Sequence, residues 1–147
     1  MTFNQLSYIL SVSQKVNITF DDEHTQFKGY IYQMDAQLIE ETRIDAQYKV
    51  TSMTLDKNNV LSIKLTKSNI FEDFKQVQIK DIIGYFAKYQ TSNIISYFAG
   101  YIKVRIISKD YTEINTTLNK LCKDKWLQNK CLILLYWYSN KLRIYVS

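Results

Sequence analysis

The chain of 147 residues is 46% hydrophobic and 22% charged, with 12 tyrosines and 7 phenylalanines. A composition this apolar and aromatic excludes a disordered chain, and the length suits a single domain. The sequence has no proline and only 3 glycines, which disfavours collagen-like, linker-like and glycine-loop nucleotide-binding proteins.

The longest apolar run, Cys131 to Tyr138, is far shorter than the roughly 20 residues that a membrane-spanning helix needs. The first residues lack the positive charge and the small-residue cleavage site of a signal peptide. Two cysteines cannot build a disulfide framework, and with the single His24 they would need several carboxylates to complete a zinc site. We therefore expect a soluble, unprocessed, intracellular domain without a metal or cofactor.

The net charge of +5 is unevenly distributed. Residues 1–73 hold 7 basic and 10 acidic side chains, a net of −3, whereas residues 74–147 hold 12 basic and 4 acidic ones, a net of +8. A basic half with interleaved tyrosines is typical of a surface that binds a polyanion such as nucleic acid. An ordinary solvated face in a sequence rich in lysine, asparagine and tyrosine is the alternative.

In chain order, the first predicted element is a short helix within residues 1–10, because apolar residues recur there at helical spacing. A β-branched segment, 16–20, follows and is expected to be extended. Period-two alternation then predicts a strand over 27–32, within which Gly29 indicates a bulge or a bend.

The middle of the sequence predicts two hairpins. The alternating runs 48–55 and 60–65 are joined by Asp56-Lys57-Asn58-Asn59, and Asp and Asn tolerate the backbone angles of a tight turn. The runs 82–89 and 94–107 predict the second hairpin.

A helix is predicted over residues 110–126. Asp110 would cap its first turn, and Glu113 would complete a pair like a capping box. The helix would present a single apolar stripe, made of Ile114, Leu118, Leu121 and Cys122.

These elements predict an all-β domain with flanking helices, spanning residues 1–147. We expect a five-stranded OB-fold barrel over about 25–108, a closing helix over 110–126 and an additional hairpin over 131–146. Barrel closure would remove the exposed edges of very apolar strands. A flat five-stranded sheet with helices on one side is the main alternative.

The sequence offers no catalytic constellation. Its glycines fit neither a phosphate-binding loop nor a dinucleotide fingerprint. A nucleophilic triad or dyad would depend on His24, which lies in an acidic stretch beside no candidate nucleophile. The carboxylate pairs Glu40-Glu41 and Glu72-Asp73 are expected to be solvated, so we predict that the protein is not an enzyme.

The order of segments resembles a known family, the small TEN-type subunit of the telomeric CST complex, which is related to the small subunit of RPA. NVLSIKLTKSNIFEDFKQVQIKDIIGYFAKYQ is similar to the family's third strand, linker and fourth strand. GYIKVRIISKDYTEINTTLNKLCKDKW is similar to its fifth strand and closing helix, and residues 27–55 match the first two strands more loosely. The tail over 127–147 departs from the family.

The resemblance implies a non-catalytic OB-fold subunit of a heterotrimer in the nucleus, at telomeres. Its closing helix would bind an STN-type OB-fold subunit, beside a large CTC-type subunit. The assembly would bind telomeric single-stranded DNA and recruit polymerase α–primase for C-strand fill-in. The 10 glutamines would suit the version that accompanies telomerase in ciliates.

Two sets of candidate site residues follow. The partner-binding set comprises Ile114, Leu118, Leu121 and Trp126, which could instead cap the barrel of their own chain. The nucleic-acid-binding set comprises Tyr30, Tyr32, Lys49, Lys64, Lys103 and Arg105, which could instead be ordinary solvent-facing strand residues. A stand-alone nucleic-acid-binding module, such as a divergent ribosomal or organellar RNA-binding protein, and a plain assembly protein are the alternative functions.

Overall fold

A computed structural model describes residues 1–20, 25–34, 48–56, 58–68, 76–87 and 102–147. The first half contains α1 (Phe3–Ile9), β1 (Lys15–Phe20), β2 (Thr25–Tyr30), the 3₁₀ turn η1 (Ile31–Gln33), β3 (Tyr48–Leu55) and β4 (Val60–Lys67). The second half contains α3 (Ile79–Ala87), β5 (Lys103–Ile107), β6 (Glu113–Thr117), α5 (Leu118–Leu121), α6 (Lys125–Gln128), β7 (Leu132–Tyr138) and β8 (Lys141–Val146). The described chain is therefore mostly β, with a few short helices.

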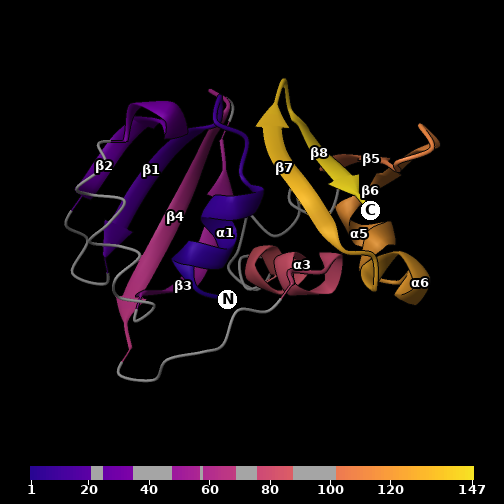
Figure 1. Ribbon diagram of the computed structural model, residues 1–147, viewed down its shortest axis with the longest axis horizontal. Coiled ribbons are helices and arrows are strands. Elements are labelled where there is room, and N and C mark those ends of the chain that lie inside the picture. Colours follow the sequence, from indigo (N-terminus) through magenta and orange to yellow (C-terminus); the bar gives the residue numbers. More distant parts are fainter. Residues whose placement is uncertain (21–24, 35–47, 57, 69–75, 88–101) are drawn as a thin grey trace.

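The strands form two four-stranded sheets of mixed pairing, which stand side by side in Figure 1. The strand order is β2-β1-β4-β3 in the first sheet and β6-β5-β8-β7 in the second. In each sheet two antiparallel hairpins are joined through a central parallel pair, β1 with β4 and β5 with β8. Parallel neighbours cannot be joined by a tight turn. The chain therefore passes through β2 and β3 between β1 and β4, and through β6 and β7 between β5 and β8.

The two sheets repeat one another in topology and in register. Adding four to each strand number converts the first strand order into the second. Within the parallel pairs, Val16 lies opposite Leu61 in the first sheet, and Val104 lies opposite Leu142 at the same place in the second. The edge strands β3 and β7 also share a register shift of one residue at equivalent positions.

The helices extend this correspondence. We call residues 1–67 the first repeat and residues 77–146 the second repeat. In each repeat, a backbone N–H near the start of β3 or β7 donates to the carbonyl of the residue two before the helix, at 3.0 Å and 2.8 Å respectively. An isolated antiparallel bridge lies beside each of these bonds. Among the described residues, each repeat thus has one helix followed by four strands in the same order, and the second repeat adds the short helices α5 and α6.

One hydrophobic core joins the repeats. Helix α1 packs against β7 of the second repeat, and α3 packs against β3 of the first, so each repeat covers part of the other (Figure 1). Each fully buried apolar side chain contributes about 1.5–3 kcal/mol, which makes this shared core the main source of stability. Its central residues are Val16, Ile18, Leu61, Ile63, Val104, Ile106, Leu142 and Ile144.

Several predicted elements are confirmed. The helix within residues 1–10 is α1, and the extended segment after it is β1. The predicted strand at 27–32 corresponds to β2, which ends at Tyr30. Gly29 has a φ of 149°, but the register shift of this strand pair lies between Ile18 and Thr19 and not at Gly29. The hairpin over 48–65 is β3–β4, and the additional hairpin over 131–146 is β7–β8.

The prediction of a strand starting at Ile82 is wrong, because this segment belongs to helix α3. Ile79, Ile82, Ile83 and Phe86 are spaced as one helical stripe, and all four are buried. A short apolar run fits a buried helix as well as a strand, and here the helical spacing decides. The rest of the predicted hairpin, up to residue 101, lies outside the described residues.

The closing helix predicted over 110–126 is also wrong. Residues Glu113–Thr117 form strand β6, and only the short helices α5 and α6 follow it. The Asp110 carboxylate accepts a bond from the N–H of Thr112 at 3.1 Å, and Tyr111 has a φ of 64°. Asp110 therefore shapes a tight turn between β5 and β6 instead of capping a helix.

The five-stranded barrel expected over 25–108 is not what the described strands form, since they pair in two four-stranded sheets. The physical reason lies in the parallel pairs β1–β4 and β5–β8, which join strands far apart in the chain. Alternation identifies a strand and a turn identifies a hairpin, but neither identifies such a non-local partner. His24 and the carboxylate pairs at 40–41 and 72–73 lie outside the described residues.

Candidate nucleic-acid interface

The outer face of the second sheet gathers basic and aromatic side chains. Along its strands, buried residues of the core alternate with residues on the opposite, accessible side. Register places two rows of these outer residues side by side across the sheet. We define the basic face as Lys103, Arg105, Tyr136, Tyr138, Lys141, Arg143 and Tyr145.

Four cations occupy the centre of the basic face. Because β5 and β8 are neighbours, Lys103 lies opposite Lys141 and Arg105 lies opposite Arg143. Like charges placed directly opposite one another destabilise a sheet. A fold has no structural need for two such pairs in succession, so the arrangement favours a role in binding an anion.

One carboxylate offsets part of this charge. Glu113 forms two contacts with Arg105, Nε to Oε1 at 2.7 Å and Nη2 to Oε2 at 2.7 Å. The hydrogen bond with Arg105 is the main cause that lowers the pKa of the Glu113 carboxyl from its ordinary value. With Glu113 ionised, the four cations and this one acid leave a local net charge of +3.

Arg143 and two tyrosines form a packed group next to the cation rows. Tyr136 and Tyr138 stack with ring centroids 5.8 Å apart and an interplanar angle of 4°. The guanidinium carbon of Arg143 lies 5.8 Å from the centroid of Tyr138, within range of a cation–π contact. The Nε of Arg143 is shielded from solvent and has no hydrogen-bond acceptor among the described residues. The group thus places a guanidinium beside flat aromatic surface.

Two shallow hollows border the basic face. One, of about 380 Å³, lies beside Lys103 and Lys141, and Lys120 adds a third cation to its lining. The other, of about 640 Å³, lies at the far end of the sheet beside Arg105 and carries exposed aromatic residues. Among its lining residues are Lys109, Tyr111, Ile133 and Tyr145. The first hollow thus extends the row of cations, and the second adds aromatic rings beside Arg105.

The first repeat gives an internal reference for this surface. At the positions of the first sheet that are equivalent to Arg105 and Arg143, Asn17 lies opposite Ser62. The positions matching Lys103, Lys141, Tyr136 and Tyr145 hold Lys15, Val60, Thr54 and Lys64. The core positions between them are apolar in both repeats. The framework therefore folds without paired arginines or central tyrosines, which are particular to the second repeat.

Of the six predicted nucleic-acid-binding residues, Lys103 and Arg105 belong to the basic face. The other members of the face were not predicted from the sequence. The signal for them is present in the alternation of the hairpin at 131–146, whose outward residues from Tyr136 to Tyr145 are largely basic or aromatic. The pairing of β8 with β5 brings these residues beside Lys103 and Arg105, and local sequence patterns do not predict that pairing.

The other four predicted residues lie on the first repeat. Tyr30 and Lys64 occupy the outer side of the first sheet. Tyr32, in η1, stacks on Tyr30 with ring centroids 5.3 Å apart. Lys49 is half-buried on β3, beside the start of the chain. The structure therefore divides the predicted set between the two repeats.

The predicted partner-binding stripe does not exist as a surface. Leu118 and Leu121 are each 1% exposed in the core of their own chain, and Ile114 is half-buried on β6. Trp126 on α6 is 66% exposed, with the Nζ of Lys130 4.3 Å from its ring centroid. Of the four residues, only Trp126 is largely exposed to solvent.

Within the described ranges, no three His, Cys, Asp or Glu side chains gather as a metal-binding group. The described helices include none with the length and apolar character needed to cross a membrane. Burial raises the pKa of the Cys122 thiol, which disfavours the reactive thiolate form. The basic face, by comparison, gathers four cations and three tyrosine rings.

No protein-family model, curated protein or solved structure matches this chain. The basic face is therefore the feature of the described residues that bears most on function. Arginine forms bidentate contacts with phosphate groups, and tyrosine rings stack on planar bases. A ligand that carries both phosphates and accessible bases would use both components of the face.

Proposed function

We propose that this protein is a non-catalytic module that binds single-stranded nucleic acid on its basic face. The observation that carries the proposal is the succession of the Lys103–Lys141 and Arg105–Arg143 pairs beside the stacked tyrosines. Binding of phosphate groups alone would require only the cations of the basic face. Unpaired bases in addition can stack on aromatic rings, with roughly 1–3 kcal/mol for each base, whereas a duplex keeps its bases paired and inside.

A more specific form of the proposal comes from the resemblance to the TEN-type subunit. In this form the protein is a nuclear, telomeric subunit of a CST-like heterotrimer that binds an STN-type chain and a CTC-type chain. Telomerase and polymerase α–primase would then be the further partners. That form assumes an OB-fold barrel and a partner-binding helix, and of the residues predicted for the partner contact Trp126 remains accessible. The general form depends on neither feature.

The test is a binding titration by fluorescence anisotropy with single-stranded DNA, single-stranded RNA and duplex DNA of equal length. We expect single strands to bind more tightly than the duplex. The logarithm of the affinity should fall with the logarithm of salt concentration by about 0.7 for each phosphate contacted, so by about 3 if all four cations bind phosphates.

Two comparisons sharpen this test. Polyglutamate supplies negative charge without bases, so it should compete weakly with a single strand. A telomeric repeat strand that binds better than its scrambled sequence would support the telomeric form. Absence of binding to any single strand, or an affinity that salt does not change, would overturn the proposal as a whole.

A further inference from the structure

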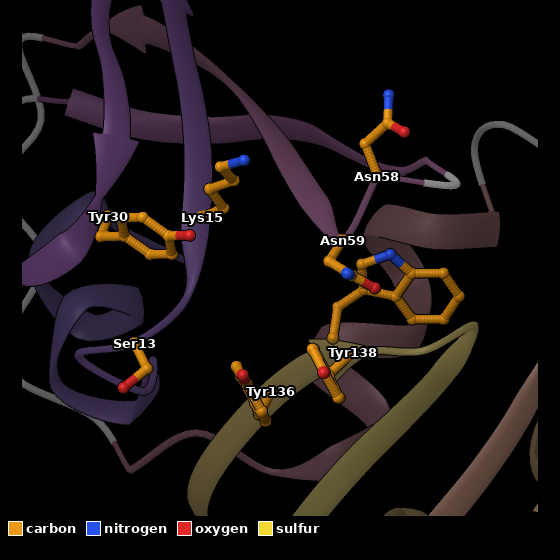
Figure 2. A pocket seen from close by; sticks show the side chains of 8 residues that line it. Ser13, Lys15, Tyr30, Asn58, Asn59, Tyr136 and Tyr138 are labelled. Atoms are coloured by element: carbon orange, nitrogen blue, oxygen red, sulfur yellow. The ribbon is translucent and has the colours of Figure 1, made fainter.

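A hollow of about 200 Å³ opens where the two repeats meet, and we call it the inter-repeat pocket (Figure 2). It is bordered on one side by the start of β1 and the end of β2, and on the other by the end of β7. Residues from all of these strands and from the β3–β4 turn line it, among them Lys15, Tyr30, Asn58, Asn59, Tyr136 and Tyr138. Tyr136 and Tyr138 also belong to the basic face, so the pocket adjoins it directly.

Aromatic rings stand on both sides of the pocket. Tyr30 comes from the first repeat and is backed by Tyr32, with ring planes 14° apart. Tyr136 and Tyr138 come from the second repeat and back each other. The ammonium of Lys15 lies 5.6 Å from the centroid of Tyr30, so a cation accompanies the ring on the first-repeat side. Figure 2 shows Lys15 and Tyr30 across the open space from the two second-repeat tyrosines.

A hydrogen-bonded floor holds the two sides in place. Gln14, which is fully buried, donates from Nε2 to the carbonyl of Asn59 at 3.0 Å and accepts at Oε1 from the N–H of Trp137 at 2.7 Å. The Asn59 side chain accepts from the N–H of Ser139 at 2.7 Å. The Trp137 indole donates to the carbonyl of Asp56 at 2.8 Å. These bonds join both repeats, so the pocket is formed before a ligand arrives.

We infer that the inter-repeat pocket binds one unpaired base of a single strand that lies on the basic face. Its volume is below the range of roughly 300–1,000 Å³ that is usual for whole small-molecule ligands, and it suits a single planar ring. Tyrosines on both sides supply stacking surface, and the exposed Asn58 amide can donate to and accept from a base edge. Lys15 can bind the neighbouring phosphate. This inference rests on the proposed function.

The test compares oligothymidylate of about ten nucleotides with a chain of equal length made of abasic sites, which keeps the phosphates and removes the bases. Tyr30→Ala lies outside the basic face and removes one ring of the pocket. We expect it to weaken oligothymidylate binding at least about fivefold, the equivalent of losing one weakly stacked base. It should leave both the affinity for the abasic chain and the salt dependence unchanged.

Tyr30→Phe keeps the ring and should keep the wild-type affinity for oligothymidylate. If Tyr30→Ala lowers the thermal stability, Asn58→Ala at an exposed turn position serves as the second variant, with the same expected selectivity. Wild-type affinity in both alanine variants would overturn the inference and leave the proposed function intact. Equal losses on the abasic chain would also overturn it, because the pocket would then act through phosphate. A wild-type protein that binds neither chain would instead remove the proposed function.

Discussion

The first repeat presents Asn17 opposite Ser62 at the centre of its sheet, whereas the second presents Arg105 opposite Arg143 at the same place. One residue away along each strand, on the core side, both repeats bury aliphatic side chains in matching register. The inner positions are constrained by packing, since protein interiors are close-packed. The outer positions are not, and there the repeats differ in charge and aromatic content. The comparison separates what the framework requires from what a ligand would require.

Net charge follows the same division. Residues 1–73 sum to −3 and residues 74–147 to +8. The first sheet does carry lysines on its outer side, among them Lys15, Lys28 and Lys64, but they are spread over three strands. In the second sheet four cations lie on two adjacent strands, where their fields add over a short distance. The second repeat therefore differs from the first in the close spacing of its cations as well as in its net charge.

The largest expected effect concerns the shared core. Ile18→Ala and Ile106→Ala remove equivalent buried side chains, 2% and 1% exposed, from the two repeats. Each should lower the free energy of unfolding by about 2–5 kcal/mol, because burial is lost and a cavity forms. Urea unfolding followed by tryptophan fluorescence and by circular dichroism should give one coincident transition for both variants. A separate, earlier transition confined to the mutated half would show that the repeats fold independently.

The junction between the repeats should give an intermediate effect. Gln14→Ala leaves the buried N–H of Trp137 without its acceptor, and an unsatisfied buried donor costs about 1–3 kcal/mol. Ser13→Ala, at the exposed neighbouring position, is the matched control and should stay within about 0.5 kcal/mol of the wild type. Chemical denaturation measures both. Equal stability of the two variants would mean that the junction does not depend on Gln14.

The smallest expected effect comes from Glu113. Its lowered pKa means that any contribution of the Arg105 pair to stability is complete above the ordinary glutamate pKa and is lost as pH falls through the lowered value. Protonation also raises the local net charge from +3 to +4. Glu113→Gln reproduces this at neutral pH and should strengthen oligonucleotide binding about two- to fivefold at low salt, with little effect at high salt. An unchanged affinity at low salt would place the bound strand away from Arg105.

Local elements could be predicted from the sequence where a strand pairs with the next strand along the chain. The hairpin at 48–65 has Asp and Asn in its turn, and in the structure Asn59 adopts a φ of 65°. The helix at 79–87 is not predicted because the apolar run from Ile82 fits a buried strand as well as a helix, although the spacing of Ile79, Ile82 and Phe86 is helical. Asp110 was interpreted as a helix cap because the same side chain chemistry serves caps and tight turns.

The candidate site could be predicted only in part for a related reason. Lys103 and Arg105 were identified from their own strand, whereas Lys141 and Arg143 join them only through parallel pairing across a long sequence separation. The internal repeat was missed as well. Its sequence signal is short, Lys-Val-x-Ile at 15–18 and 103–106 and Leu-x-Ile at 61–63 and 142–144, and it becomes clear only in the register.

The central claim is that the second repeat binds nucleic acid through outer residues that its framework does not need. The most direct measurement transfers the first-repeat residues onto the basic face, as Arg105→Asn, Lys141→Val, Arg143→Ser and Tyr136→Thr together. Lys28→Asn with Lys64→Tyr is the control, because it removes two lysines from the first sheet and puts there the residues found at the matching positions of the second sheet, Asn115 and Tyr145. Anisotropy titration with a single strand should show an affinity loss of at least about tenfold for the transfer variant, with its unfolding transition preserved, and little change for the control. Wild-type affinity in a folded transfer variant would contradict the account.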